Sequence, residues 1–308
     1  MSMLNKKIDF NKSLKPVLIV YAALIIVGII ISCIFGVKLD INFTGGARIS
    51  YSYTGEIDTA AVEKDITDSL GSGAAVTYST DISGETKQIV ISLSGNKGVT
   101  ADTQNTLTEK LQTNFKDNTI ELYDSNSVSP TIAGTFFAKS LVAVAIAGIL
   151  VVIYVGIRFR NIGGVSAAIT AFASLILDCL VAFLACVIFR LPVDSNLIAV
   201  ILTLLGYSLN DTIVIYDRIR ENKRLYPQMD IAENVNESVN SVKMRNFFTT
   251  FTTVCAVVTI IVVSEIFALT TLRSFAIPMV FGIVSGCISS LFISSPLWVI
   301  WKKATKKK

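Results

Sequence analysis

Six long apolar runs constrain the fold of this chain more than any other feature. They cover residues 16–36, 136–157, 165–189, 195–216, 247–268 and 275–301 of a 308-residue sequence. About 20 apolar residues suffice to cross the hydrocarbon core of a bilayer as a helix. The composition, 52% hydrophobic and only 16% charged, excludes an ordinary water-soluble domain. The sequence therefore predicts six membrane-spanning helices.

The basic residues predict the direction of these spans. Of the 27 Lys and Arg residues, 17 lie in the N-terminal tail (1–15), the Arg158–Arg160 turn, the loop 217–246 and the C-terminal tail (302–308). An excess of positive charge is typical of cytoplasmic loops. We therefore expect both termini in the cytoplasm and the large segment 37–135 outside the cytoplasmic membrane. The first run is longer than a signal-peptide core, so we expect it to remain as an anchor.

The external segment, residues 37–135, alternates between strand-like and helix-like patterns in the order β-α-β-β-α-β. Val, Ile, Tyr and Thr dominate the strand-like pieces, and Asp58 is placed to cap the first helix. Gly71 and Gly84 mark turns. This order predicts a ferredoxin-like α+β domain. Its pieces are residues 47–53, 58–70, 75–79, 88–93, 100–115 and 119–123.

Several kinds of chemistry are missing from the sequence. The chain has no histidine, and its external segment has no phosphate-binding loop, nucleophile motif or metal-ligand spacing. The five cysteines all fall inside apolar runs, where free thiols behave as small core residues. A net charge of +4 is too small to indicate nucleic-acid binding. We therefore expect a protein that is not an enzyme, with no cofactor, no metal and no nucleic-acid partner.

Two carboxylates lie inside apolar runs, where an ionisable side chain costs roughly 2.5–3.5 kcal/mol on insertion scales. Asp178 continues a stripe of Ser166, Thr170 and Ser174 with i+4 spacing. Asp211 is preceded at the same spacing by Thr203 and Tyr207, with Ser208, Asn210 and Thr212 beside it. Residues four apart share a helix face, so both faces should point into the bundle. A structural polar contact remains an alternative to ion exchange for each carboxylate, more so for Asp178.

Arg245 opens the fifth apolar run and is the natural partner for Asp211. When Asp211 loses its proton, a guanidinium can compensate the new charge, so protonation can bias helix packing. The run continues with Thr249, Thr250 and Thr253, whose hydroxyls can line a path for water. The alternative is that these hydroxyls bond only to neighbouring helices or to their own backbone.

The inner end of the fourth run resembles a known family signature. The segment 206–222 reads Gly206-Tyr207-Ser208-Leu209-Asn210-Asp211-Thr212-Ile213-Val214-Ile215-Tyr216-Asp217-Arg218-Ile219-Arg220-Glu221-Asn222. It is similar to the signature of the SecF family of bacterial protein-export subunits. The turn Phe43-Thr44-Gly45-Gly46, the start of the fifth run and the six-span layout resemble the same family. Two positions depart from its usual pattern: Asn42 replaces an Asp before Phe43, and Leu177 replaces a His before Asp178.

This resemblance implies a membrane protein of the resistance-nodulation-division class, in which proton passage moves an external domain. It implies work with SecD beside the SecYEG channel, with YajC-type accessory proteins, on an exported unfolded polypeptide, driven by a proton or sodium gradient. Asp211 and Arg245 match family positions implicated in that passage. Two alternatives stay open: half of a small-molecule exporter of this class, and a passive assembly scaffold. Six spans are about half of a typical transporter of the class, so SecD is the expected second half.

Overall fold

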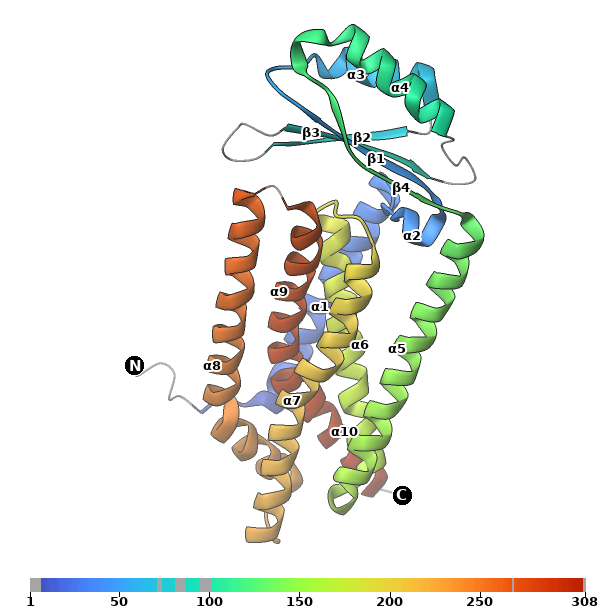
Figure 1. Cartoon of the computed structure of the whole chain (residues 1–308). Coiled ribbons are helices and arrows are strands. Elements are labelled where there is room, and N and C mark those ends of the chain that lie inside the picture. Colours follow the sequence, from blue (N-terminus) through green and yellow to red (C-terminus); the bar gives the residue numbers. More distant parts are fainter. Residues whose placement is uncertain (1–6, 71–73, 81–86, 95–100, 268, 307–308) are drawn as a thin grey trace.

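The computed structural model describes residues 7–70, 74–80, 87–94, 101–267 and 269–306. Within them a long helix bundle carries a small sheet domain at one end (Figure 1). This arrangement confirms the predicted fold class, a membrane helical bundle with one α+β domain. Six helical spans are long and apolar enough to cross a membrane: α1 (Phe10–Phe35), α5 (Pro130–Arg158), α6 (Gly164–Ile188), α7 (Ser195–Leu225), α8 (Ile231–Ile266) and Thr271–Thr305.

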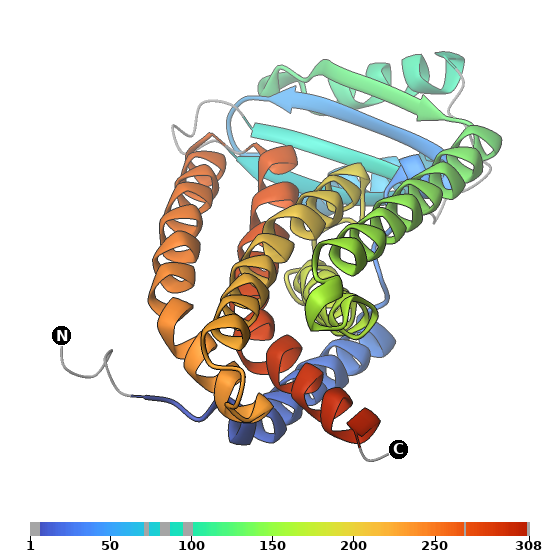
Figure 2. The ribbon, with the colours of Figure 1, turned by 90° about the horizontal axis from the view of Figure 1, so that it is seen from below.

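The sixth span is not one regular helix. It consists of α9 (Thr270–Ser289), a π-helical turn η4 (Ser290–Ser294) and α10 (Ser295–Lys306). A π-helical turn shifts the register of the side chains that follow it and often occurs at functional sites. Seen along the bundle, α6, α7 and α9 lie in the middle, with α8 at one edge and α5 at the other (Figure 2).

The segment 217–246, expected as a cytoplasmic connection between two spans, is largely helical. Only five residues separate the end of α7 at Leu225 from the start of α8 at Ile231. The charged run at the end of α7 forms ion pairs along the helix, and buried amides join the two arms. These contacts are Arg218–Glu221 (2.7 Å), Arg220–Asp217 (2.8 Å) and Asn222 Nδ2 to Ser238 Oγ (2.9 Å).

The external domain is a four-stranded antiparallel sheet with the order β2-β3-β1-β4. Helices α3 and α4 cover the face of the sheet that points away from the bundle (Figure 1). This is the split β-α-β arrangement of a ferredoxin-like domain. The elements are β1 (Gly46–Tyr53), α3 (Thr59–Leu70), β2 (Ala74–Thr80), β3 (Lys87–Ser94), α4 (Ala101–Asn114), η2 (Lys116–Asn118) and β4 (Glu121–Val128).

Apolar side chains at every second position of the strands form the core of this domain. Ile49 and Tyr51 on β1 and Ile89 and Ile91 on β3 are fully buried against the two helices. Asp58 caps α3 as expected, since its Oδ1 accepts from the backbone N of Ala60 at 3.0 Å. The expected turns at Gly71 and Gly84 and the helix start at residue 100 lie outside the described residues.

The junction between domain and bundle is built around the short helix α2 (Ile41–Thr44). Asp40 is buried, caps α2 through the backbone N of Asn42 (3.0 Å) and forms an ion pair with Arg48 on β1. The Asp40 backbone N also donates to Val193 O at 3.1 Å, in the turn between α6 and α7. The external sheet is therefore tied to two different parts of the bundle.

The motif Phe43–Gly46 has a physical role at this junction. The Phe43 ring packs against Phe136 and Phe137 at the start of α5, with centroid distances of 5.9 and 5.4 Å. Gly45 has a φ of +74°, and a Cβ there would lie 2.7 Å from the Pro130 backbone. Only glycine meets both demands without strain, so the motif lets the first span, the sheet and the second span meet closely.

Candidate functional site

Asp178 lies in the middle of α6 and is fully buried. Its carboxylate accepts three hydrogen bonds from serine hydroxyls. Ser208 on α7 donates at 2.5 Å, and Ser285 and Ser289 on α9 donate at 2.7 and 3.0 Å. A buried charged group is tolerated when such bonds replace its hydration. The three central helices are therefore joined at this carboxylate.

Two further residues complete the surroundings of Asp178. The Tyr21 hydroxyl of α1 donates to Ser285 O at 3.1 Å and lies 2.8 Å from Ser285 Oγ. Gly286 on α9 lies directly against α7, where an added Cβ would be 2.7 Å from Ser208 Oγ. The absence of a side chain at Gly286 thus allows Ser208 to reach Asp178.

Hydroxyl pairs continue from this point toward the basic end of the bundle. Thr212 on α7 meets Ser290 in η4 at 3.1 Å. One turn on, the Tyr216 hydroxyl lies 2.8 Å from Thr170 Oγ1 and 3.0 Å from Ser294 Oγ. At the end of the series, Trp298 Nε1 donates to Ser166 Oγ at 3.1 Å. Ser166 and Thr170 of the predicted stripe therefore face the bundle.

The sequence interpretation missed the serines of the sixth span. Ser285, Ser289, Ser290 and Ser294 are all buried and all bond to α6 or α7 side chains. Their recurrence at four or five residues was a usable signal. Serine is common in apolar helices and often bonds only to its own backbone, as Ser174 does here to Ala171 O at 2.7 Å.

Asp211 has a different environment, although it lies one turn after Ser208 on α7. It is 2% exposed, and its Oδ2 has no hydrogen-bond partner within the described residues. Asn246 Nδ2 on α8 is likewise buried without a partner there. Thr250, one turn further on, is also buried and lies next to the thiol of Cys287 on α9, which is close to Asp211 as well. Unsatisfied buried polar groups are rare in folded proteins and often mark functional sites.

The predicted Asp211–Arg245 contact is not formed within the described structure, which corrects the sequence interpretation. Arg245 is exposed, whereas Asn246, the next residue, is buried. Because α8 begins at Ile231, Arg245 lies inside a regular helix, where one residue turns the side chain by about 100°. Arg245 is nevertheless close enough to Asp211 to interact with it electrostatically.

The remaining residues of the predicted polar face divide into two groups. Tyr207 joins α7 to α8, since its hydroxyl donates to Thr253 Oγ1 at 3.0 Å and to Thr249 O at 3.3 Å. Thr203 and Asn210 are exposed on this chain, and Thr203 bonds its own helix at Ala199 O. The prediction that Thr203 faces into the bundle was wrong. Thr203 precedes Asp211 by eight residues, and over eight residues a helix turns by about 80° beyond two full turns, so the two side chains point in different directions.

The hydroxyls of α8 do not form a continuous path. Thr249 is exposed and bonds its own backbone at Arg245 O, 2.7 Å away. Thr253 bonds Thr249 O at 2.9 Å in addition to accepting from Tyr207. Thr249 and Thr253 therefore bond to their own backbone and to a neighbouring helix, as in the alternative to a water path.

The charged end of the segment 206–222 fixes the positions of neighbouring helices. Asp217 pairs with Arg158 at the end of α5, 3.1 Å away. Arg218 donates to Ser241 Oγ on α8 at 3.2 Å. Gly206, at the other end of the segment, has open space around it, since no atom of the described chain lies within 4 Å of an added Cβ.

Metal chemistry has no obvious site among the described residues. They contain no group of three or more His, Cys, Asp or Glu side chains that could hold a metal ion. All five cysteines are free thiols.

Comparisons with known proteins establish the family. Residues 107–304 match the family described as protein export membrane protein SecD/SecF, C-terminal. The chain belongs to the SecD/SecF family. It is 30% identical to protein translocase subunit SecF of Alicyclobacillus acidocaldarius, over 98% of this chain and 95% of that protein.

The SecDF relatives are longer than this chain. The chain is 36% identical to protein translocase subunit SecDF of Bacillus subtilis over 98% of its own length, but spans only 39% of that protein. The crystal structure of SecDF from Thermus thermophilus matches 98% of this chain and 40% of that chain, with a TM-score of 0.81 and 23% identity. This structural match supports the fold.

Proposed function

We propose that the chain is a SecF-type accessory subunit of the Sec protein translocase. It works with a SecD-type partner to promote export of unfolded polypeptides, using the proton or sodium gradient. The relatives reported above are named as translocase subunits, and the SecF protein of A. acidocaldarius is matched over nearly its whole length. These names favour export over the alternative of a small-molecule exporter.

The observation that carries this proposal is a polar edge of the bundle that the chain leaves uncovered. Thr203, Gly206 and Asn210 on α7 and Thr249 and Thr252 on α8 are exposed within membrane-length helices. The three threonine hydroxyls bond their own helix, whereas the Asn210 amide forms no hydrogen bond among the described residues and is costly in hydrocarbon, so a lone subunit is disfavoured. The fused SecDF chains carry a further part absent from this sequence. A SecD-type partner packed against α7 and α8 would cover this edge and enclose Arg245.

Asp211 is the group we assign to ion exchange. Its unpartnered oxygen lies close to Cys287 of α9, which also lies next to Thr250 of α8, so a change of charge at Asp211 favours rearrangement between these helices. Moving one charge through 100 mV supplies about 2.3 kcal/mol, enough to shift a two-state equilibrium by between one and two orders of magnitude. Asp178 is fully hydrogen-bonded, and we assign it to the fixed core.

The junction is the route by which this movement reaches the external domain. Helix α8 stands at the edge of the bundle, and α1 and α5 lead directly into the sheet (Figures 1 and 2). Asp40 and Phe43 tie that sheet to the α6–α7 turn and to α5. Any turn of the sheet relative to the bundle must therefore change the contacts of Asp40 and Phe43, and in this proposal such a turn binds or releases an exported polypeptide.

The proposed location is the cytoplasmic membrane with both termini inside. Helix α1 begins and α10 ends at the side of the bundle opposite the sheet (Figure 1). The basic residues concentrate at the same side. Contacts with a SecYEG channel and YajC-type proteins follow from the resemblance to the family.

Substitution at the open glycine tests the proposal. Gly206→Trp adds a large side chain where the chain itself has room, and Gly134→Trp does the same on α5. We expect Gly206→Trp to abolish co-purification with a co-expressed SecD-type partner and to abolish export of a reporter protein. Gly134→Trp should retain both. Normal partner binding and export with Gly206→Trp would rule out this edge as the interface.

A further inference from the structure

Residues 7–11, here called the strap, lead into α1 beside the end of α8 that lies furthest from the sheet (Figures 1 and 2). This end, residues 231–240, is called the α8 arm. Asn240 clamps the main chain of Ile8, because its Oδ1 accepts from the Ile8 N at 3.0 Å and its Nδ2 donates to the Ile8 O at 2.8 Å. Asn236, one turn earlier, accepts from the Phe10 N at 3.0 Å. The strap is therefore held through its backbone.

Side chains of the strap extend this contact. Asn11 Nδ2 donates to Ala232 O at 3.0 Å, and Lys7 pairs with Glu237 at 2.6 Å. The contacted positions 232, 236 and 240 are four residues apart, so they share one face of α8. The strap runs antiparallel to α8 along this face for about 12 Å, at 1.5 Å per residue. Such a length of bonded chain favours a permanent attachment over a brief contact.

Phe10 ties the strap to the sixth span. Its side chain is 1% exposed, and its ring packs against Phe292 of η4 with a centroid distance of 4.9 Å. Pro296 lies four residues after Phe292 and has no N–H for the Phe292 carbonyl, and its ring would clash there in a regular helix. The wider turn η4 lies at this position. Phe10 is therefore anchored on the irregular turn of the sixth span, while the backbone beside it is bonded to α8.

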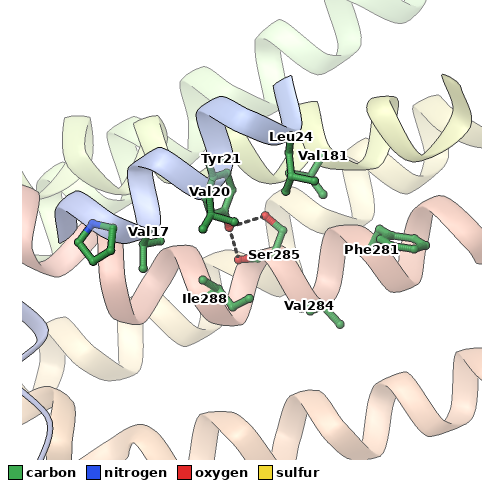
Figure 3. A pocket seen from close by; sticks show the side chains of 10 residues that line it. Val17, Val20, Tyr21, Leu24, Val181, Phe281, Val284, Ser285 and Ile288 are labelled. Atoms are coloured by element: carbon green, nitrogen blue, oxygen red, sulfur yellow. Dashed lines mark hydrogen bonds between the residues drawn. The ribbon is translucent and has the colours of Figure 1, made fainter. Parts of the chain in front are cut away.

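The helix that follows the strap is fixed to the same span. Leu14 and Tyr21 of α1 are buried, and the Tyr21 hydroxyl is bonded to Ser285 of α9 (Figure 3). Ser285 in turn donates to Asp178 in the fixed core of the bundle. The strap therefore connects this core, on one side, with the α8 arm on the other.

The two halves of α8 are held to different degrees. The arm is bonded to α7 as well as to the strap, since Asn234 Nδ2 donates to Ile219 O at 3.4 Å and Ser238 accepts from Asn222 at 2.9 Å. A helix segment with few buried contacts opens and moves more easily than a well-packed one. The buried residues of the arm lie close together, whereas those of the membrane half are widely spaced: Asn234, Val235, Ser238 and Val239 against Asn246, Thr250, Val257 and Ser264.

We propose that the strap fixes the α8 arm to the sixth span, so that a change of charge at Asp211 tilts the membrane half of α8 about the arm instead of moving the whole helix. This inference rests on the proposed function, in which Asp211 exchanges ions and α8 rearranges. With the arm fixed, the movement is largest at the end of α8 nearest the sheet (Figure 1). Without the strap, ion exchange displaces the arm instead, so ion flux continues while export is lost.

Hydrogen exchange of the chain in complex with its co-expressed partner tests this proposal, with export and ion flux measured on the same variants. Asn236→Ala combined with Asn240→Ala removes the amides that hold the strap. Because alanine is a better helix former than asparagine, faster exchange in this variant cannot come from a weaker helix. Glu233→Ala, at an exposed position of the arm, is the matched control.

A second pair of variants changes the strap at one position. Ile8→Pro removes the backbone N–H that bonds Asn240, and Ile8→Ala keeps it. We expect exchange in residues 231–240 to become roughly fivefold faster in Ile8→Pro and faster still in the double variant, as for the loss of one or more hydrogen bonds. Both controls should match the parent chain.

Export should fall several-fold in the double variant while ion flux stays near the parent level. Unchanged exchange in the double variant and in Ile8→Pro would overturn the proposal, and so would export and flux that fall together. Asp211→Asn, measured beside them, separates this inference from the proposed function. Loss of export with Asp211→Asn but normal export without the strap contacts would overturn the strap proposal alone. Normal export with Asp211→Asn would overturn the proposed function itself.

Discussion

Ser208 on α7 donates a 2.5 Å hydrogen bond to the Asp178 carboxylate on α6, and both side chains are buried. With Ser285 and Ser289 of α9, this bond joins three helices at one point. Asp211, only three residues after Ser208, keeps a buried oxygen without a partner in the described chain. The two intramembrane carboxylates therefore differ in role, one holding helices together and the other available for exchange.

Removing the donor tests the anchoring role of Asp178. Ser208→Ala leaves the buried carboxylate with one bond fewer, which should destabilise the purified chain by about 1–3 kcal/mol. Thermal unfolding in detergent measures this change. Thr203→Ala on the same helix should be nearly neutral, because Thr203 is exposed and bonds its own backbone. Equal stabilities for the two variants would show that the Asp178 bonds do not hold the bundle together.

The close approach of α9 to α7 gives a second prediction. Gly286→Ala places a methyl group 2.7 Å from Ser208 Oγ, so Ser208 must turn away from Asp178 or the helices must separate. Overpacking of this kind costs about 1–3 kcal/mol. The matched change Gly134→Ala meets no atom within 4 Å and should not destabilise the chain. The prediction is tested by comparing the melting temperatures of both variants with that of the parent chain.

Much of the fold could be predicted from the sequence because its signals are local. Six apolar runs specify six spans, and the alternation at Ile49 and Tyr51 specifies a buried strand face. The intramembrane carboxylates were recognisable from their cost in hydrocarbon. The contacts of Asp211 were not predictable, because they depend on how α8 is rotated, which its sequence does not encode locally. The serines of the sixth span were missed because serine in an apolar helix often bonds only to its own backbone, and because Ser290 and Ser294 lie in the π-helical turn, which departs from the regular helix period.

The ion pair at the junction gives a third prediction. Asp40→Asn keeps an acceptor that can cap α2 but removes the charge that pairs with Arg48. Because the Arg48 side chain is 35% exposed, losing its partner costs about 1–3 kcal/mol, less than breaking a fully buried pair. Hydrogen exchange should therefore become faster around α2 and β1 in this variant. The double change Asp40→Asn with Arg48→Gln should recover part of the protection, and an unchanged exchange pattern in the single variant would contradict the account.

Tyr78 in the external domain gives a prediction about pH. Its hydroxyl donates to Thr59 O at 3.0 Å, and burial, with negative charge from Glu63 nearby, raises the pKa of Tyr78 from 10.0 to about 12. The folded domain holds this proton more tightly than the unfolded chain, so its contribution to stability is complete below pH 10. That contribution is lost as the pH rises from 10 to about 12.

Comparison with Tyr78→Phe isolates this effect. The free energy of unfolding of the domain, followed by circular dichroism, should fall less steeply above pH 10 in the variant than in the parent chain. Parallel curves for the two chains would show that Tyr78 does not titrate in this way.

The most direct test of the central claim is export of a reporter protein, with ion flux measured in parallel, for Asp211→Asn and Asp211→Glu. Both variants would be co-expressed with the SecD-type partner at matched membrane levels. Asn keeps the size of Asp211 but cannot exchange a proton, so export and flux should both be lost. Glu retains a carboxyl group and should keep a part of each. Normal export and normal flux with Asp211→Asn would contradict the account, because the driving force would then enter elsewhere.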